Sequence, residues 1–407
     1  MAKSEIISCI DVGTTKICSI MAKPGQNGEL QVLGVGLTPS RGLHKGLVVN
    51  ISEARESIRN SVRKAEQASG LKMESVYVGV TGRHVTSLNK RGVVSISRND
   101  KLVRPDDLKR VMQSARTFTV PNDRKLLHVI PRGYAIDGQT GVKNPVGMHG
   151  FRLDVETHVI TAAVASVQNL VKCIRGVNLE IEDLVLEPLA SSEAVLRHDE
   201  RDAGVILADI GGGTTDIAIF KNGSIWHTAI LPVAGYQMTR DIAIGLGIPF
   251  DTAEQVKRKF GSVMPIYDSA EDDSATPLST NGYGVSYQDL SDIIRARVEE
   301  IIKLIALELP SDYDREVPAG LVLTGGCANL KGIAPVARDI LELPVRVGVP
   351  QGVYGIADVL PDPAFATGVG LLLWGDRKFG SAQNWRSSGV SDSLRKLAIR
   401  MRKLILH

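Results

Sequence analysis

The chain has few cysteines, few aromatic residues and no long apolar run, and each shortage excludes a class of protein. Its four cysteines include no CxxC pair, so we expect a reducing compartment and neither a zinc site nor a disulfide framework. No apolar run approaches the ~18 residues that a membrane-spanning helix needs. An apolar run at residues 6–10 follows the start directly, without a signal-peptide pattern. A spanning helix is therefore excluded, whereas attachment to a membrane surface is not.

The chain also has little net charge, since 48 Lys and Arg against 45 Asp and Glu give +3. This balance does not indicate a nucleic acid partner. Hydrophobic residues make up 43%, aromatic residues only 4%, and there are 40 glycines. Such a composition favours an aliphatic α/β fold with glycine-containing turns. At ~100–200 residues per domain, the 407 residues allow two to four domains.

An internal repeat is the most informative feature of the sequence. Residues 6–20 form an apolar run, Asp11, a Gly13-Thr14-Thr15 turn and a second apolar run that starts at Lys16. Residues 205–220 repeat this order with Asp209 and the turn Gly211-Gly212-Gly213-Thr214-Thr215. The repeat predicts a two-lobed molecule with one such turn in each lobe.

The two turns have the chemistry of a phosphate site. Successive backbone N–H groups at a glycine turn can approach an anion closely, threonine hydroxyls add donors, and Lys16 adds a compact positive charge. Asp11 and Asp209 could hold a hydrated Mg²⁺ beside the turns. The Walker pattern GxxxxGK[ST] is absent. The alternative is a pair of ordinary glycine-rich hairpins, which the matched repeat disfavours.

Other segments break the symmetry of the two halves. Residues 84–164 have no counterpart in the second half and carry the short strand candidates 91–97 and 126–135, so we expect a small inserted α+β subdomain. Residues 286–309 show the apolar period of an amphipathic helix. A third glycine turn, Gly325-Gly326 with Asn329, follows the strand-like residues 320–323 and could let a base or ribose pack against the backbone.

The last residues predict an amphipathic, cationic helix. At ~100° per residue, its apolar side chains fall within an arc of about 120° with basic side chains opposite. Such a helix lies in the interface of an anionic bilayer. The alternative is a terminal helix docked on the protein's own core. The residues assigned to membrane binding are Leu394, Lys396, Leu397, Arg400, Met401, Lys403, Leu404 and Ile405.

The three turns resemble the phosphate-1, phosphate-2 and adenosine motifs of the actin, chaperone and sugar-kinase ATPase superfamily. Within it, the chain resembles the FtsA family of bacterial cell-division proteins over nearly its whole length. The matching segments are residues 40–46, 127–131, 143–147 and 189–192. The resemblance implies an α/β, two-lobed actin-like fold of duplicated ribonuclease-H-like domains, with an inserted α+β subdomain in the first lobe and a C-terminal amphipathic helix.

This resemblance implies a division of the chain into domains. We expect the first-lobe core over 1–83, completed by 165–195 and about 362–377; the inserted FtsA-type subdomain over 84–164; the second-lobe core over 196–227 and 310–361; its outer subdomain over 228–309; a flexible linker over 378–391; and a membrane-targeting helix over 392–407.

The resemblance also implies roles for individual residues. Glu254 would accept hydrogen bonds from the ribose and Lys257 would lie near the base, although both could equally belong to a solvated helical face. Glu187 would orient the attacking water as a weak catalytic group, or else is a surface acid. Arg297 and Glu300 would receive the tail peptide of FtsZ, or else belong to a solvated face. The residues expected around the nucleoside are Gly235, Glu254, Lys257, Gly325, Gly326 and Asn329.

The resemblance implies an ATP- and Mg²⁺-binding protein with at most slow ATP hydrolysis. It would polymerise on the cytoplasmic face of the bacterial inner membrane at the division site, anchor FtsZ there, and recruit later division proteins through the inserted subdomain. Alternatives are a small-molecule kinase or a chaperone ATPase of the same superfamily. A kinase has no use for a lipid-seeking tail, and too few residues follow the last core segment for a peptide-binding module.

Overall fold

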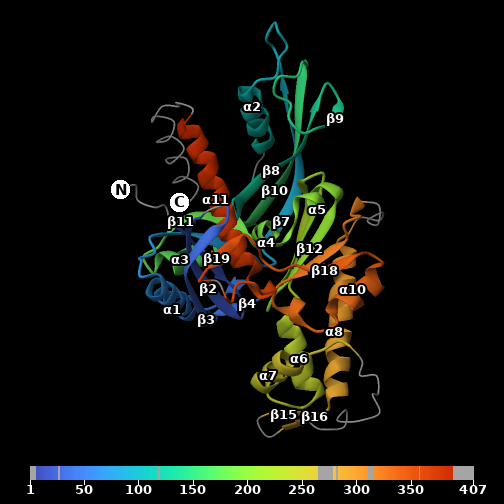
Figure 1. Cartoon of the computed structure of the whole chain (residues 1–407). Helices are drawn as coiled ribbons and strands as arrows, with labels where there is room; N and C mark the ends of the chain where they lie inside the picture. Colours follow the sequence, from blue (N-terminus) through green and yellow to red (C-terminus); the bar gives the residue numbers. More distant parts are fainter. Residues whose placement is uncertain are drawn as a thin grey trace.

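The architecture is built on two β-sheets that share one topology. It is seen in a computed structural model that describes residues 6–25, 28–117, 120–264, 278–280, 283–309, 316–356 and 358–387. The first lobe holds one of these sheets and the second lobe the other. Figure 1 shows a third sheet projecting at one end of the molecule and a group of helices at the opposite end.

The sheet of the first lobe has its two central strands on either side of the first Gly-Thr-Thr turn. Those strands are antiparallel, with Asp11 opposite Cys18. The order is β11 (Glu180–Leu186), β6 (Ser75–Val80), β1 (Ile7–Val12), β2 (Lys16–Pro24), β3 (Leu30–Pro39) and β19 (Val353–Gly355).

The sheet of the second lobe repeats this arrangement. Its order is β14 (Ser224–Leu231), β13 (Thr215–Lys221), β12 (Val205–Ile210), β17 (Leu321–Thr324) and β18 (Val345–Val347). β1 and β12 each have an antiparallel hairpin partner on one side and parallel strands on the other. The sequence repeat is therefore matched by a repeat in sheet topology.

Helices cover these sheets because their apolar residues recur on one face. α1 (Ile51–Ser69) begins at Asn50, whose side chain accepts hydrogen bonds from the N–H groups of Ser52 and Glu53. Its side chains at Ala54, Ile58, Val62 and Ala65 are buried against the first sheet, as their spacing predicts. Burying one large aliphatic side chain in this way stabilises the fold by ~1.5–3 kcal/mol.

Two helices lie between the lobes. α4 (Glu187–Val195) follows β11, and α11 (Ala366–Ser387) packs against it. Their side chains share one core with strands of both sheets. Because α4 begins at Glu187, this acid lies at the junction of the two lobes. Three further helices pack on the sheets: α3 (Val164–Arg175), α5 (His198–Ala203) and α10 (Ile333–Leu341).

The inserted stretch forms a sheet with its own small core. The order is β7 (Val85–Ser95), β10 (Arg152–Ala163), β8 (Arg124–Ile136) and β9 (Gln139–Val142), with α2 (Pro105–Arg116) packed on it. Ile96, Val111, Leu153 and Val155 are buried between them. This arrangement agrees with the α+β character expected of the inserted stretch.

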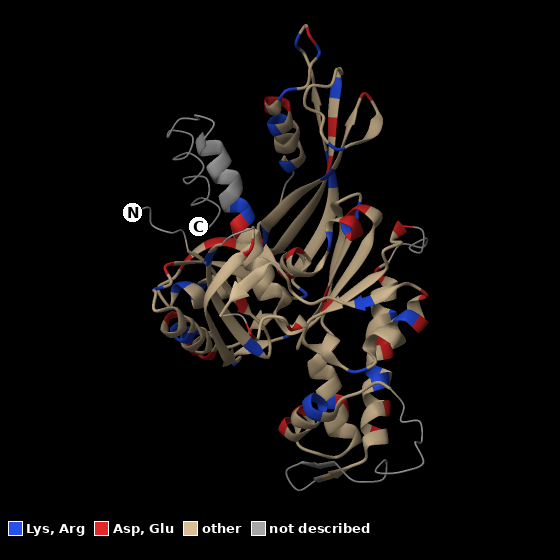
Figure 2. Cartoon of the chain, viewed as in Figure 1, with Lys and Arg blue, Asp and Glu red and all other residues tan. Residues whose placement is uncertain are grey.

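The opposite end of the molecule consists of three helices: α6 (Gly235–Gly245), α7 (Phe250–Phe260) and α8 (Tyr287–Leu307). α8 corresponds to the helix predicted over 286–309. The short elements are β4 (Leu43–His44), β5 (Leu47–Val48), β15 (Leu278–Thr280), β16 (Tyr283–Val285), η1 (Gly326–Asn329) and η2 (Pro363–Phe365). Lys, Arg, Asp and Glu are interspersed over these parts (Figure 2).

One expected segment differs from the structure. The linker predicted over 378–391 is helical where it is described, because α11 continues to Ser387. Its Ser, Gly, Gln and Asn content suggested a flexible chain, but no proline interrupts the helical hydrogen bonds there. The predicted membrane-targeting helix over 392–407 lies outside the described residues. None of the described helices is long and apolar enough to cross a bilayer.

Candidate functional site

The two Gly-Thr-Thr turns contact each other at the junction of the lobes. A Cβ atom on Gly212 would lie 2.4 Å from Cγ2 of Thr15, and one on Gly213 would lie 2.4 Å from Oγ1 of Thr14. Glycine permits this approach, because a Cβ at either position would displace the facing threonine side chain. The structure therefore brings the two repeats of the sequence to one place.

The remaining residues assigned to phosphate binding have partners within the protein. Lys16, at the start of β2, donates from Nζ to the carbonyl of Ala364 and lies 4.8 Å from the ring centroid of Phe365. Thr214 donates to Asp216 at 2.9 Å, and Thr215 donates to the carbonyl of Val233 at 2.7 Å. Gly13 and Gly211 follow β1 and β12 directly, and the N–H of Gly211 donates to the carbonyl of Thr214 at 2.9 Å. These internal bonds hold the Lys16 ammonium and the two threonine hydroxyls beside the turns.

Four buried acids gather behind the turns: Asp11, Asp209, Asp216 and Glu187. Burial raises the pKa of Asp11 to about 6, which Lys16 opposes and Asp209 reinforces. Burial also raises the pKa of Asp216 to about 7, against the hydrogen bond from Thr81. The pKa of Glu187 is raised well above its usual range by burial and then by Asp11, Asp216 and Asp209. A cation bound here would favour the ionised forms.

Hydrogen bonds tie these acids to both lobes. Asp209 accepts from Ser191 of α4 and, at 3.1 Å, from Thr367 of α11. Thr81 of the first lobe donates to Asp216 of the second. The sequence analysis missed Asp216, Ser191, Thr367 and Thr81. One signal was present for Asp216, since it follows the second turn where Lys16 follows the first.

The residues predicted to contact the nucleoside lie beside the second turn. Lys257 of α7 donates from Nζ to Glu254 at 2.6 Å and to the carbonyl of Gly235 at 3.1 Å. Gly325 adjoins Asp209, because a Cβ there would lie 2.3 Å from Oδ1 of that acid. Gly326 and Asn329 belong to η1, and the Asn329 amide donates to Asp362 at 2.8 Å.

Cys327 of η1 also belongs to this side of the site, and the sequence analysis gave it no role. Its Sγ donates to the carbonyl of Gly211 at 3.3 Å, and a Cβ on Gly235 would lie 3.0 Å from the sulfur. Burial raises the pKa of the thiol. Cys327 therefore links the third glycine turn to the second.

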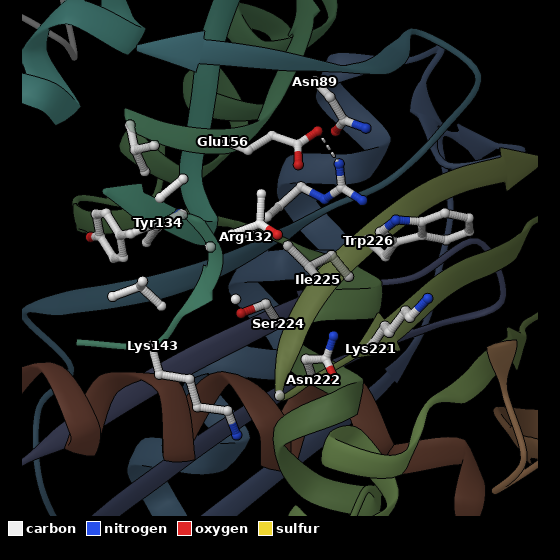
Figure 3. A pocket seen from close by; sticks show the side chains of 18 of the residues that line it. Asn89, Arg132, Tyr134, Lys143, Glu156, Lys221, Asn222, Ser224, Ile225 and Trp226 are labelled. Carbon is white, nitrogen blue, oxygen red and sulfur yellow. Dashed lines mark hydrogen bonds and ion pairs between the residues drawn. The ribbon is translucent and has the colours of Figure 1, made fainter. Parts of the chain in front are cut away.

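One of two hollows lies away from the contact between the turns, and the other lies behind that contact. The larger, of about 1090 Å³, lies between the inserted subdomain and the β13–β14 hairpin (Figure 3). In it Arg132 donates to Glu156 at 2.6 Å and lies 5.7 Å from the ring centroid of Trp226. The smaller, of about 20 Å³, adjoins Glu187. Size alone would favour the first hollow, but the glycine turns and buried acids lie elsewhere, so chemistry favours the junction of the lobes.

The predicted partner residues on α8 are less free than their spacing suggested. Arg297 donates from Nε to Asp241 of α6 and from Nη1 to Glu300, and its side chain is only 20% exposed. Arg297 therefore joins α8 to α6 as well as facing solvent. The residues assigned to membrane binding, Leu394 to Ile405, lie outside the described part of the chain.

Comparisons with known proteins agree with this arrangement. The model of the family "Cell division protein FtsA" matches residues 206–370, and that of the "SHS2 domain inserted in FTSA" matches residues 82–161. The cell division protein FtsA of Pseudomonas aeruginosa is 41% identical over 392 residues, covering 96% of this chain and 94% of that protein. The inserted stretch thus matches a domain described for this family.

Solved structures share the fold at low sequence identity. A PilM–PilN complex of type IV pilus biogenesis superposes with a TM-score of 0.65 at 18% identity, covering 91% of this chain and 98% of the other. MreB5 of Spiroplasma citri bound to AMPPNP gives 0.57 at 14% identity, covering 94% and 99%. The predicted two-lobed, actin-like α/β fold with an inserted subdomain is confirmed. Identity to the Pseudomonas protein over most of both chains shows more than a shared fold: this chain belongs to the FtsA family of cell-division proteins.

Proposed function

We propose that the chain binds ATP between its lobes, with both Gly-Thr-Thr turns and Lys16 on the phosphates. The observation that carries this proposal is the meeting of the two turns in front of four buried acids. Glu254, Lys257 and the Gly325-Gly326 turn lie on one side of that meeting point, where a nucleoside would extend from the phosphates. The MreB5 structure that shares the fold is bound to AMPPNP, which supports nucleotide binding at the junction of the lobes here.

The acid cluster fits a magnesium ion held through water. Asp11 and Asp209 offer carboxylate oxygens, which Mg²⁺ prefers, and it usually keeps several of its waters. Among the described residues no three His, Cys, Asp or Glu side chains are placed as direct ligands, so a site with few protein ligands is the one that fits. The ion would neutralise phosphate charge. Glu187 would orient the attacking water, and we expect slow turnover because Glu187 is the one acid in this cluster to which we assign that role.

Binding of ATP can be tested by calorimetry on the full chain with magnesium. Lys16→Ala should weaken ATP binding by ~1–3 kcal/mol, the scale of a lost charge-assisted hydrogen bond. Lys72→Ala is the matched control, because Lys72 is 83% exposed and its ion pair among the described residues is with Glu66. Equal affinities of the two variants would remove Lys16 from the site. Absence of any heat with ATP in the wild type would refute the nucleotide site.

We also propose that the chain polymerises on the cytoplasmic face of the inner membrane at the division site and anchors FtsZ there. Membership of a cell-division family supports the setting. The cationic, apolar pattern of residues 392–407 supports anchoring to anionic lipid. The FtsZ tail would bind at α8 near Arg297 and Glu300, and later division proteins would bind at the inserted subdomain. The hollow at Arg132 and Trp226 supplies a surface for the latter (Figure 3).

A further inference from the structure

The small hollow beside Glu187 has the size and lining of a water site. Its volume of about 20 Å³ exceeds the ~10–15 Å³ that one water molecule needs. Most of its wall is apolar, and its polar side chains are Thr81, His84 and Glu187. Thr81 already donates to Asp216, so its hydroxyl could only accept from a water. The side chains of this hollow with a hydrogen bond still to make are the imidazole of His84 and the carboxyl of Glu187.

The ring nitrogens of His84 are unsatisfied hydrogen-bonding groups. Both of its ring nitrogens are buried and neither has a partner. Burial, together with Arg124, lowers the pKa of His84 to about 4, so the neutral ring has one donor and one acceptor nitrogen. A buried polar atom without a partner destabilises the folded state, because it has lost its hydrogen bonds to water. A water in the adjoining hollow would remove part of this cost.

The backbone leaves room for both side chains. Gly82 has φ +120°, a value that disfavours other residues, and a Cβ there would lie 3.0 Å from Nδ1 of His84. A Cβ on Gly79 would lie 3.1 Å from Cγ and 3.2 Å from Oε1 of Glu187. Larger residues would therefore push the ring and the carboxyl out of their places around the hollow.

His84 also stands where the inserted subdomain joins the first lobe. Its carbonyl accepts a hydrogen bond from Nη1 of Arg124 at 2.9 Å and one from the N–H of Ala163 at 3.2 Å. Arg124 begins β8, Ala163 ends β10, and β7 starts directly after His84. Three strands of the inserted sheet thus meet at this residue.

We propose that a water in this hollow joins His84 to Glu187, so that His84 is a positioning residue for the Glu187 carboxyl. Through this water the root of the inserted subdomain is linked to the junction of the lobes. The catalytic consequence rests on the proposed role of Glu187 in slow ATP turnover. The water site itself does not depend on nucleotide.

The link can be tested by NMR on the full chain labelled with ¹⁵N-histidine and free of nucleotide, in which His84→Gln assigns one of the eight histidines. Glu187→Gln should shift the ring nitrogen signals of His84. Glu193→Gln should leave them in place, because Glu193 lies on the same helix but pairs with Arg201 and Arg377. Unchanged His84 signals in Glu187→Gln would overturn the proposal.

A second measurement separates this proposal from the nucleotide site. If ATP turns over, His84→Leu should slow it several-fold, whereas His84→Gln, which can still bond a water, should keep most of the rate. Equal loss in both variants would indicate a merely structural role and contradict positioning through water. If calorimetry shows no ATP binding, the proposed function fails, while the NMR comparison still decides whether the water link exists.

Discussion

Burial fixes the protonation of individual residues in the site. For Asp216 the pKa in the folded chain is about 7, above the ordinary value of 3.8. Between these values the folded state binds the proton more strongly than the unfolded state does. The stability that Asp216 contributes is therefore fully present below about pH 4 and is lost as the pH rises through about 7. Above that pH the ionised, buried acid destabilises the nucleotide-free protein.

Asp216→Asn removes this pH dependence. We compare the free energy of unfolding of the variant with that of the wild type. As the pH rises from 4 to 8, this difference should shift in favour of the variant by on the order of 2–4 kcal/mol, at ~1.4 kcal/mol per pKa unit. Thermal or urea unfolding without nucleotide at both pH values measures the change. Comparing the two pH values cancels any hydrogen bond lost to Thr81 or Thr214. Asp106→Asn, at a side chain that is 79% exposed, is the control and should show no such gain.

The variant must be compared with the wild type because three histidines change the stability with pH in the opposite direction to Asp216. Burial lowers the pKa values of His84, His128 and His158 to about 4. Their stability is present above the ordinary value of 6.5 and is lost as the pH falls towards 4. The wild-type profile alone would mix the two effects. A gain in Asp216→Asn that is the same at both pH values would contradict the raised pKa of Asp216.

Among the elements, α8 carries the proposed contact with the FtsZ tail. Arg297→Glu reverses one charge and breaks its bond to Asp241, so we expect tail-peptide affinity to fall by about 1–2 kcal/mol, a 5–30-fold change. Fluorescence anisotropy with the labelled tail peptide measures it. Arg295→Glu is the matched control on the same helix, because the ion pair of Arg295 within the described part of the chain is with Glu299 of α8 itself. Equal binding by the wild type and Arg297→Glu would remove α8 from the interface.

The same helix shows what local pattern can and cannot predict. Its apolar period and Ser286, which caps its first turn, are local properties, and the helix was predicted nearly to its ends. The partner of Arg297 is Asp241 on α6, and only the folded chain brings them together. Asp216 was missed for the same reason, since its side chain is buried against Thr81 of the other lobe. The linker prediction is wrong for residues 378–387, where α11 continues, because Ser, Gly, Gln and Asn lower helix propensity without removing the backbone hydrogen bonds as proline does.

On the scale of the whole molecule, the repeat predicted two lobes but not that their turns would be in contact. If phosphates bind between the turns, the lobes must part to admit them. The Cβ that Gly212 would carry lies 3.2 Å from Cβ of Thr15, near the ~3.5–4.5 Å of a disulfide. A Thr15→Cys, Gly212→Cys double variant should therefore crosslink on oxidation and lose ATP binding, which reduction restores.

This crosslink has two controls. Either single variant should bind ATP equally well before and after oxidation, since the four native cysteines are buried. Calorimetry in both redox states measures binding, and mass spectrometry confirms the bond. If the crosslinked protein binds ATP as the reduced one does, the phosphates do not enter between the turns.

Assembly of whole molecules should determine how firmly the chain holds a membrane. The helix predicted over 392–407 would bury only a few large side chains, at ~1.5–3 kcal/mol each less the cost of ordering them. Its basic residues add about 1 kcal/mol each near anionic lipid. A single copy should therefore bind reversibly, whereas a polymer that presents many copies should bind tightly through effective concentration. Filament formation would then control residence at the membrane.

Sedimentation with anionic liposomes tests this anchor on the full chain. Leu397→Glu and Met401→Glu place a charge in the apolar stripe and should release the protein to the supernatant. Raised salt should weaken the wild type, because it screens the basic face. Lys72→Ala, a change of charge far from the tail in sequence, should still sediment. If both tail variants pellet with the vesicles as the wild type does, the tail is not the anchor and a terminal helix docked on the protein's own core explains its apolar stripe.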